Sequence, residues 1–339
     1  MKSPLLETNK ISGVHYALTT DGLELPVVDV THPAFALNVT DTEQRTLTEK
    51  FLQDRGSFAG LPAPLRNVLL RFFLRGSILA DGIRKAQDTF MSGMHTYLLK
   101  LGPKMLGSAY TKPIDRRIAS SFPVLAVRWR LQDVAQLMAE ALLPFLVGES
   151  TRPLHFLNIA GGPAIDSLNI LILLRKRQPE VFGERQISID VLDLDNSGPA
   201  FGARALASLA QEGGPLHGLQ VAFRHVPYDW RRAENLRPVL NKARTKHALS
   251  ICSSEGGLFE YGSDDEIQSN LKVLRESAEM VAVVGSVTRA DEPIQRVRRM
   301  GRAATCPRGL KVFGCLIAET GWKVAQAVER PFSDQVLLT

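Results

Sequence analysis

The chain has 339 residues, of which 45% are hydrophobic and 22% are charged, a balance that excludes a disordered or fibrous protein. No stretch of about 18 uncharged apolar residues occurs, and no basic segment followed by an apolar core opens the chain, so neither a membrane span nor a secretory signal is predicted. The net charge of +6 permits an acidic partner without requiring one. Three cysteines without metal-ligand spacing predict no metal site and suit reduced thiols in a cytoplasmic protein.

Residues 1–150 are predicted to form a mainly helical N-terminal accessory domain with a short hairpin. The hairpin is expected around Asp21-Gly22, a turn signal within an alternating apolar and polar stretch. Thr40 or Thr42 suits the N-cap of the first helix. Helical spacing predicts helices at about 40–54 and 123–147, and one or two helices over 65–91, where Gly76 and Gly82 interrupt the pattern. Gly/Pro-rich breaks are expected at 56–64 and 102–113.

A strand, a small-residue turn and a helix follow one another directly between His155 and Leu174. A glycine turn at the start of a helix lets the backbone approach a ligand, with free N–H groups pointing at it. The same pattern is also typical of a tight strand-to-helix connection. The next strand, however, ends in Asp193, at the place where nucleotide-binding folds keep a carboxylate for a ribose. The combination therefore favours a nucleotide site.

From residue 154 onward, short apolar strands alternate with helices, which is typical of a mostly parallel sheet covered on both faces. Strands are predicted at 154–159, 187–194, 219–224, 247–252 and 280–286, and helices at about 164–178, 198–212, 232–243, 263–278 and 309–320. Two last strands, at 322–328 and 335–338 around a turn at 331–334, must pair antiparallel because a parallel pair needs a long crossover. The predicted fold class is α/β, with a seven-stranded Rossmann-like sheet over residues 151–339.

This second half resembles the class I S-adenosylmethionine-dependent methyltransferases in the order and position of its motifs. The turn after the first strand resembles the family's cofactor loop, Asp193 is similar to its ribose carboxylate, and Asp229-Trp230 to its adenine contact. Residues 253–261 stand where the family lines the junction of cofactor and substrate. The resemblance implies S-adenosylmethionine as the cofactor, held by Asn158, Ala160, Gly161, Gly162, Pro163, Ala164, Asp193, Leu194, Asp229, Trp230 and Ser253.

The cofactor loop departs from the family pattern at three positions. Asn158 stands in place of an acidic residue, and Ala160 and Ala164 stand in place of two glycines. Alanine suits those positions where φ is negative, and its methyl group takes space near the cofactor. Because a fold can host unrelated activities, a binding protein or a non-methylating enzyme stays open as an alternative.

Methyl transfer needs an aligned acceptor, and it needs a base only when the acceptor must first lose a proton. Glu255 and His225, which follow the fourth and third strands, are the candidate catalytic residues. For His225, a structural hydrogen bond at the sheet edge is the alternative. Glu255, Tyr261 and His95 are the candidate acceptor contacts, although a satisfied polar group is the more common role of such a histidine. Asp195 is expected to cap the following helix.

A small-molecule acceptor of a biosynthetic or secondary-metabolite pathway is predicted, in a pocket closed by the N-terminal helices. The Asn/Asp-Pro-Pro-Tyr tetrapeptide of nucleic-acid amino methyltransferases is absent after the fourth strand, and Cys252 lies outside any Pro-Cys loop. An RNA or nucleotide-linked acceptor stays open as an alternative, because six arginines lie between Arg289 and Arg308. These arginines suit an anion clamp or a solvated helix face over 292–303. No membrane partner is expected, and a homodimer is left open.

Overall fold

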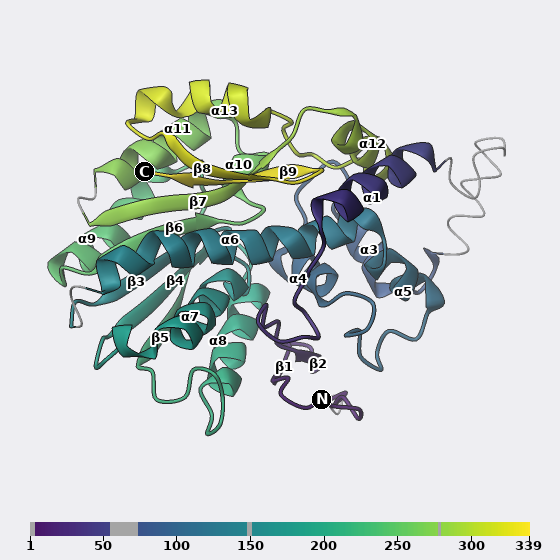
Figure 1. Cartoon of the computed structure of the whole chain (residues 1–339), viewed down its shortest axis with the longest axis horizontal. Coiled ribbons are helices and arrows are strands. Elements are labelled where there is room, and N and C mark those ends of the chain that lie inside the picture. Colours follow the sequence, from purple (N-terminus) through teal and green to yellow (C-terminus); the bar gives the residue numbers. More distant parts are fainter. Residues whose placement is uncertain (1–3, 55–73, 148–150, 277–278) are drawn as a thin grey trace.

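The computed structural model describes residues 4–54, 74–147, 151–276 and 279–339 (Figure 1). Seven strands form one sheet in the order β5-β4-β3-β6-β7-β9-β8. Strands β3 to β7 run parallel, whereas β9 pairs antiparallel with both β7 and β8. The strands are β3 Leu154–Ile159, β4 Ile187–Asp193, β5 Val221–Pro227, β6 Leu249–Ser254, β7 Met280–Thr288, β8 Val324–Glu329 and β9 Ser333–Leu338. The predicted fold class is therefore confirmed.

The last strand differs from its prediction at its start. The turn was expected over 331–334, but β9 already begins at Ser333. Ser333 pairs with Thr288 of β7, and Asp334 pairs with Glu329 of β8. Because β9 has a neighbouring strand on each side, its polar first residues can complete the ladder, and the turn shortens accordingly.

Helices cover both faces of the sheet (Figure 1). One core cluster joins one sheet face, including Phe156, to α6, α7 and α8, and a second joins the other face, including Leu157, to α9, α11 and α13. Successive residues of a strand point to opposite faces, so a strand buried on both sides reads as a continuous apolar run. These helices are α6 Phe122–Leu146, α7 Ile165–Arg177, α8 Ser197–Leu209, α9 Arg237–Thr245, α11 Asp264–Arg275 and α13 Gly309–Ile317.

The described N-terminal part contains the predicted hairpin, formed by β1 Tyr16–Leu18 and β2 Glu24–Pro26. Thr40 caps the first helix in a capping box, in which its hydroxyl accepts from the N–H of Glu43. The predicted break at 56–64, and residues 65–73 of the next predicted helix, lie outside the described residues. The helices here are α1 Asp41–Gln53, α3 Ile78–Lys85, α4 Gly93–Leu101 and α5 Pro113–Ala119.

Helices α4 and α5 were not predicted. Residues 97–101 of α4 are all buried, so the second half of the helix does not alternate between an apolar and a polar face, and only the spacing of Ser92, Thr96 and Lys100 indicates a helix. Helix α5 has only seven residues. A hydroxyl cap from Ser92 marks the start of α4, since its side chain accepts from the N–H of His95.

Helix α6 belongs to the N-terminal 150 residues but packs on the sheet. Its residues Leu137, Met138 and Leu142 share one buried cluster with Leu168 and Ile172 of α7. The expected domain boundary near residue 150 falls at residues 148–150, outside the described ranges, and the division into two domains stays a prediction. None of the described helices is long and apolar enough to cross a membrane.

Candidate functional site

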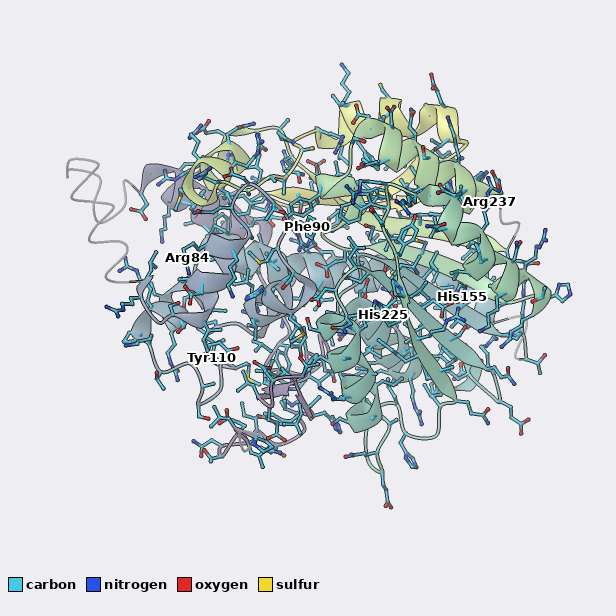
Figure 2. The ribbon with its side chains drawn as sticks, turned by 180° about the vertical axis from the view of Figure 1, so that it is seen from behind. Arg84, Phe90, Tyr110, His155, His225 and Arg237 are labelled. Carbon is cyan, nitrogen blue, oxygen red and sulfur yellow. The ribbon has the colours of Figure 1, made fainter. Side chains whose placement is uncertain are left out.

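A cavity of about 550 Å³ opens at the carboxyl ends of β3, β4, β5 and β6. Open α/β sheets bind ligands at this edge, and the volume suits a small molecule. The N-terminal segment around Phe90, labelled in Figure 2, forms part of the wall. The lining comprises residues 90–93, Thr96, Lys100, 160–163, 192–195, 228–231, 255–257, Tyr261 and Glu266.

In the loop after β3, every second residue from Ala160 to Ala164 has a left-handed backbone conformation. Ala160, Gly162 and Ala164 have φ values of 54°, 51° and 50°. Neither alanine therefore meets the condition of a negative φ under which alanine suits these positions. Their Cβ atoms make this conformation cost about 1–2 kcal/mol per residue relative to the right-handed one. Backbone hydrogen bonds from Ala160 to Leu192 (2.7 Å) and from Ala164 to Gly161 (2.8 Å) hold the loop in shape.

Asp193 anchors this loop from the end of β4. Its Oδ2 accepts from the N–H of Gly162 and its Oδ1 from the N–H of Asp195, each at 2.9 Å. Burial raises the pKa of Asp193 above its usual value even though these two N–H groups favour the charged form. Asp195 accepts from the N–H of Ser197, the first residue of α8, at 3.0 Å. The N-cap of α8 is Asn196, so Asp195 supports the start of this helix from the position before the N-cap.

Two aromatic rings from distant parts of the chain meet at the cavity. The ring centroids of Phe90 and Trp230 lie 6.1 Å apart, with the planes at 64°. Trp230 follows β5, whereas Phe90 precedes α4. Next to Trp230, the carboxylate of Asp229 accepts from Nη2 of Arg231 at 2.6 Å, and this bond lowers the pKa of Asp229. The rings of Phe90 and Trp230 give the cavity an apolar edge that suits a planar ring.

The inner part of the cavity wall carries a buried cluster of four charges. Lys100 of α4 donates to Oε2 of Glu255, and Arg130 of α6 donates from Nε to Oε1 of the same carboxylate at 2.6 Å. Nη1 of Arg130 also donates to both oxygens of Glu260, at 3.2 and 3.1 Å. Burial works to raise the pKa of Glu255, but the charges of Lys100 and Arg130 outweigh it and hold that pKa low. A carboxylate held in this way is a weak proton acceptor.

Most of the residues predicted from the sequence meet in this cavity. Ten of them line it: Ala160, Gly161, Gly162, Pro163, Asp193, Leu194, Asp229, Trp230, Glu255 and Tyr261. Burial raises the pKa of Tyr261 to about 12. The described lining does not include five others: Asn158, Ala164, Ser253, His225 and His95.

Asn158 and Ser253 lie beneath the loop. Asn158 is fully buried, and its Nδ2 donates to Ser253 Oγ (2.6 Å) and to Asp166 Oδ1 (2.8 Å). Its Oδ1 accepts from the hydroxyl of Ser167 at 2.9 Å. This network ties β3, β6 and the start of α7 together under the cavity. Ala164 is likewise buried, at the N-cap of α7.

The two predicted histidines have structural partners. His225 of β5, labelled in Figure 2, donates from Nε2 to the carbonyl oxygen of Asp193 at 2.9 Å. Nδ1 of His95 lies 2.7 Å from the hydroxyl of Ser92, and its ring packs against Gly82 of α3. Burial lowers the pKa of His95.

Sequence reasoning missed the contribution of α4 and of Arg130. Ser92, Thr96 and Lys100 recur every four residues and line the cavity together, because residues four apart lie on one helix face. That polar spacing within an apolar stretch was the available signal. Arg130 gives no such signal, because its buried partners, Glu255 and Glu260, lie far away in the sequence.

Five of the six arginines between 289 and 308 have partners within the chain, whereas the buried Nε of Arg298 has none among the described residues. Arg289 contacts Asp291 at 2.6 Å and Asp334 at 2.9 Å. Arg308 contacts Asp264 at 2.8 Å. The other partners are Leu52 O for Arg296, Glu292 for Arg299 and Asp88 for Arg302. These contacts join α12, Glu292–Gly301, and its flanks to several parts of the chain.

No family model matches the chain, and no curated protein matches it. Among solved structures, the pyocyanin biosynthetic protein PhzM is 15% identical with a TM-score of 0.40, covering 88% of this chain and 73% of its own. The mitomycin 7-O-methyltransferase MmcR is 14% identical with a TM-score of 0.39, covering 86% and 74%. The complex of LepI with SAM is 12% identical with a TM-score of 0.39, covering 87% and 83%. Likenesses at these values do not establish the chemistry of this chain.

Proposed function

We propose that this protein is an S-adenosylmethionine-dependent methyltransferase acting on a small-molecule acceptor. The observation that carries the proposal is the composition of one continuous cavity. Its outer part joins a glycine loop, the carboxylate of Asp193 and the ring of Trp230 at the carboxyl edge of a parallel sheet. Its inner part reaches Lys100 and Tyr261. In this proposal a nucleoside site and an acceptor site adjoin each other within one cavity, as a group transfer requires.

The residues present fit the cofactor. Each oxygen of Asp193 accepts one backbone N–H and keeps a second lone pair, which suits the two hydroxyls of a ribose. The Phe90 and Trp230 rings suit the adenine. Ala160 to Pro163, Asp193, Leu194, Asp229 and Trp230 would hold the cofactor, with Asn158, Ala164 and Ser253 supporting the loop from beneath. When bound, it supplies an electrophilic methyl group on a sulfonium.

The protein's own part is to orient the acceptor and exclude water. Helix α4 lies along the cavity and, in this proposal, closes it over the acceptor. Glu255 holds Lys100 and Arg130 in place, which assigns it a positioning role rather than proton abstraction. His225 orients the end of β4 through the carbonyl of Asp193. Tyr261 contacts the acceptor, and His95 secures the start of α4 through Ser92.

A small acceptor is favoured over RNA because five of the six arginines of the 289–308 segment have partners within the chain. An exposed phosphate-binding surface requires cations that are available to the phosphates. Arg289 and Arg308 instead contact acidic side chains of the protein itself.

Calorimetric titration with S-adenosylhomocysteine tests the cofactor site. The full chain should bind one equivalent, and Trp230→Ala should weaken binding about five- to tenfold through loss of ring contact, worth roughly 1–1.5 kcal/mol. Phe145→Ala removes an aromatic ring that is 48% exposed on α6 and serves as the matched control. Absence of binding to the unaltered chain would refute the proposal.

Methyl transfer is then measured with S-adenosylmethionine and a panel of phenols, amines, carboxylic acids and RNA oligonucleotides. Turnover of a small molecule supports the proposal. Cofactor binding with no turnover on any acceptor would instead make the chain a binding protein of this fold. Turnover confined to RNA would overturn the assignment of the acceptor class.

A further inference from the structure

In the described part of the chain, every carboxylate that lines the cavity accepts a hydrogen bond or pairs with a cation. Asp193 and Glu266 accept backbone N–H groups, Asp195 binds Ser197, and Asp229 and Glu255 are paired with cations. The described lining includes no histidine. Because the pKa of Tyr261 is also raised, the described lining contains no evident group to take a proton from an acceptor near neutral pH.

Lys100 is a buried cation that lines the inner part of the cavity. Only 6% of its side chain is exposed, which is unusual for lysine, and it lines the cavity from the end of α4. An ammonium has three N–H donors, and the bond to Glu255 uses one of them. The contacts described for Lys100 therefore leave donors for a ligand.

The charges around Lys100 come from four elements. Glu255 follows β6, Arg130 lies on α6, and Glu260 lies on α10, Leu258–Tyr261. Asp166 of α7 is also near, and burial, followed by the negative charge of Glu255, raises its pKa. Two cations and two paired carboxylates balance each other. An oxygen anion at Lys100 would therefore not meet an excess of negative charge from these four groups.

We propose that Lys100 binds the acceptor, and that the acceptor is a compound with an acidic hydroxyl, a phenol or an enol, held as its anion. The hydroxyl proton passes to bulk water on binding, so no protein base is needed. The ammonium stabilises the resulting oxygen anion by direct hydrogen bonding. The inference rests on the proposed function and assigns the chemical class of its acceptor.

Absorbance titrations with 4-nitrophenol and 7-hydroxycoumarin test this, because the neutral and anionic forms of these phenols absorb at different wavelengths. They are run with and without saturating S-adenosylhomocysteine. The unaltered protein should bind at least one phenol as the anion and lower its pKa by about 1–3, as an adjacent cation does. Lys100→Met should abolish that shift and weaken anion binding at least tenfold, while Lys100→Arg should retain most of it.

The matched control is Lys104→Met, which removes an exposed lysine of the same segment and should change neither quantity. If Lys100→Met does not fold, the double variant Lys100→Met/Glu255→Gln removes both charges of the pair and is used in its place. A phenol pKa that is not lowered by the unaltered protein, or is lowered equally after loss of Lys100, would overturn the inference.

The cofactor affinity separates the two proposals. If S-adenosylhomocysteine binds normally and the phenol shift is absent, only the assignment of the acceptor class fails. If S-adenosylhomocysteine does not bind but the Lys100-dependent phenol shift is present, the proposed function fails while the anion site at Lys100 stands.

Discussion

Gly93 of α4 and Gly162 of the loop after β3 meet backbone to backbone. A Cβ atom added to Gly93 would lie 2.5 Å from the Cα of Gly162, and one added to Gly162 would lie 2.8 Å from the Cα of Gly93. Gly198 of α8 approaches the same residue from another direction, since its Cβ would also come within 2.8 Å. The loop is thus enclosed between two helices, and α4 is seated directly on it.

Gly93→Ala should therefore push α4 off the loop. Backbone atoms cannot yield as the end of a side chain can, so we expect a loss of stability of about 1–3 kcal/mol and weaker S-adenosylhomocysteine binding. Urea denaturation and calorimetry measure the two effects. Gly314→Ala is the control, because a Cβ there meets nothing within 4 Å and alanine favours its helix. Equal behaviour of the two variants would contradict the close contact.

Asp193→Ala should weaken S-adenosylmethionine binding by roughly 1–3 kcal/mol, through loss of charge-assisted hydrogen bonds to the ribose. It also removes the acceptor for the N–H groups of Gly162 and Asp195, so a lower melting temperature is expected as well. Calorimetry below the melting range measures the affinity. Asp265→Ala, at an exposed position of α11, should leave both unchanged. A folded Asp193→Ala protein with full affinity would exclude the ribose assignment.

Arg130→Met should destabilise the fold by about 3–5 kcal/mol, because it leaves Glu260 buried without its cation and Glu255 with Lys100 alone. Denaturant unfolding measures the loss. Arg237→Met removes an ion pair with Glu276 in which both side chains are half exposed, and should cost less than about 1 kcal/mol. Similar losses in both variants would show that the buried ion pairs of Arg130 contribute no more to stability than an exposed ion pair.

Asp190→Asn tests the pH dependence of stability. Asp190 of β4 accepts from Nε2 of His155 (3.0 Å) and from Arg224 (2.8 and 2.5 Å). Burial works to raise its pKa, but these hydrogen bonds outweigh it, and the pKa in the folded state lies below the usual value. The folded state therefore binds fewer protons than the unfolded chain, and this contribution is complete above about pH 4 and is lost as the pH falls through the folded pKa.

The asparagine variant should accordingly be less stable than the unaltered protein at pH 7 and pH 5, by about 1–3 kcal/mol. The difference should shrink as the pH is lowered from 4 toward 2. Urea unfolding at each pH gives both values, with Asp265→Asn as an exposed control. A difference that grows on acidification would reverse the assigned direction of the pKa shift.

The sequence by itself determined the order and type of the elements in the second half of the chain. The strands from Leu154 to Leu338 are short apolar runs bounded by turns, and both signals lie within a few neighbouring residues. The same local signals placed the loop at Gly161-Gly162 and the carboxylate of Asp193 at one sheet edge, because parallel strands present their carboxyl ends together.

Only the tertiary structure determined which charged residues lie at the cavity besides those at the carboxyl edge of the sheet. Lys100 and Glu255 are 155 residues apart in the chain, and Arg130 and Glu260 are 130 apart. No local pattern encodes such pairings, since they depend on how α4 and α6 pack against the sheet. The left-handed backbone at Ala160 and Ala164 likewise could not be predicted from the sequence. Alanine does not favour this conformation, and the surrounding contacts impose it.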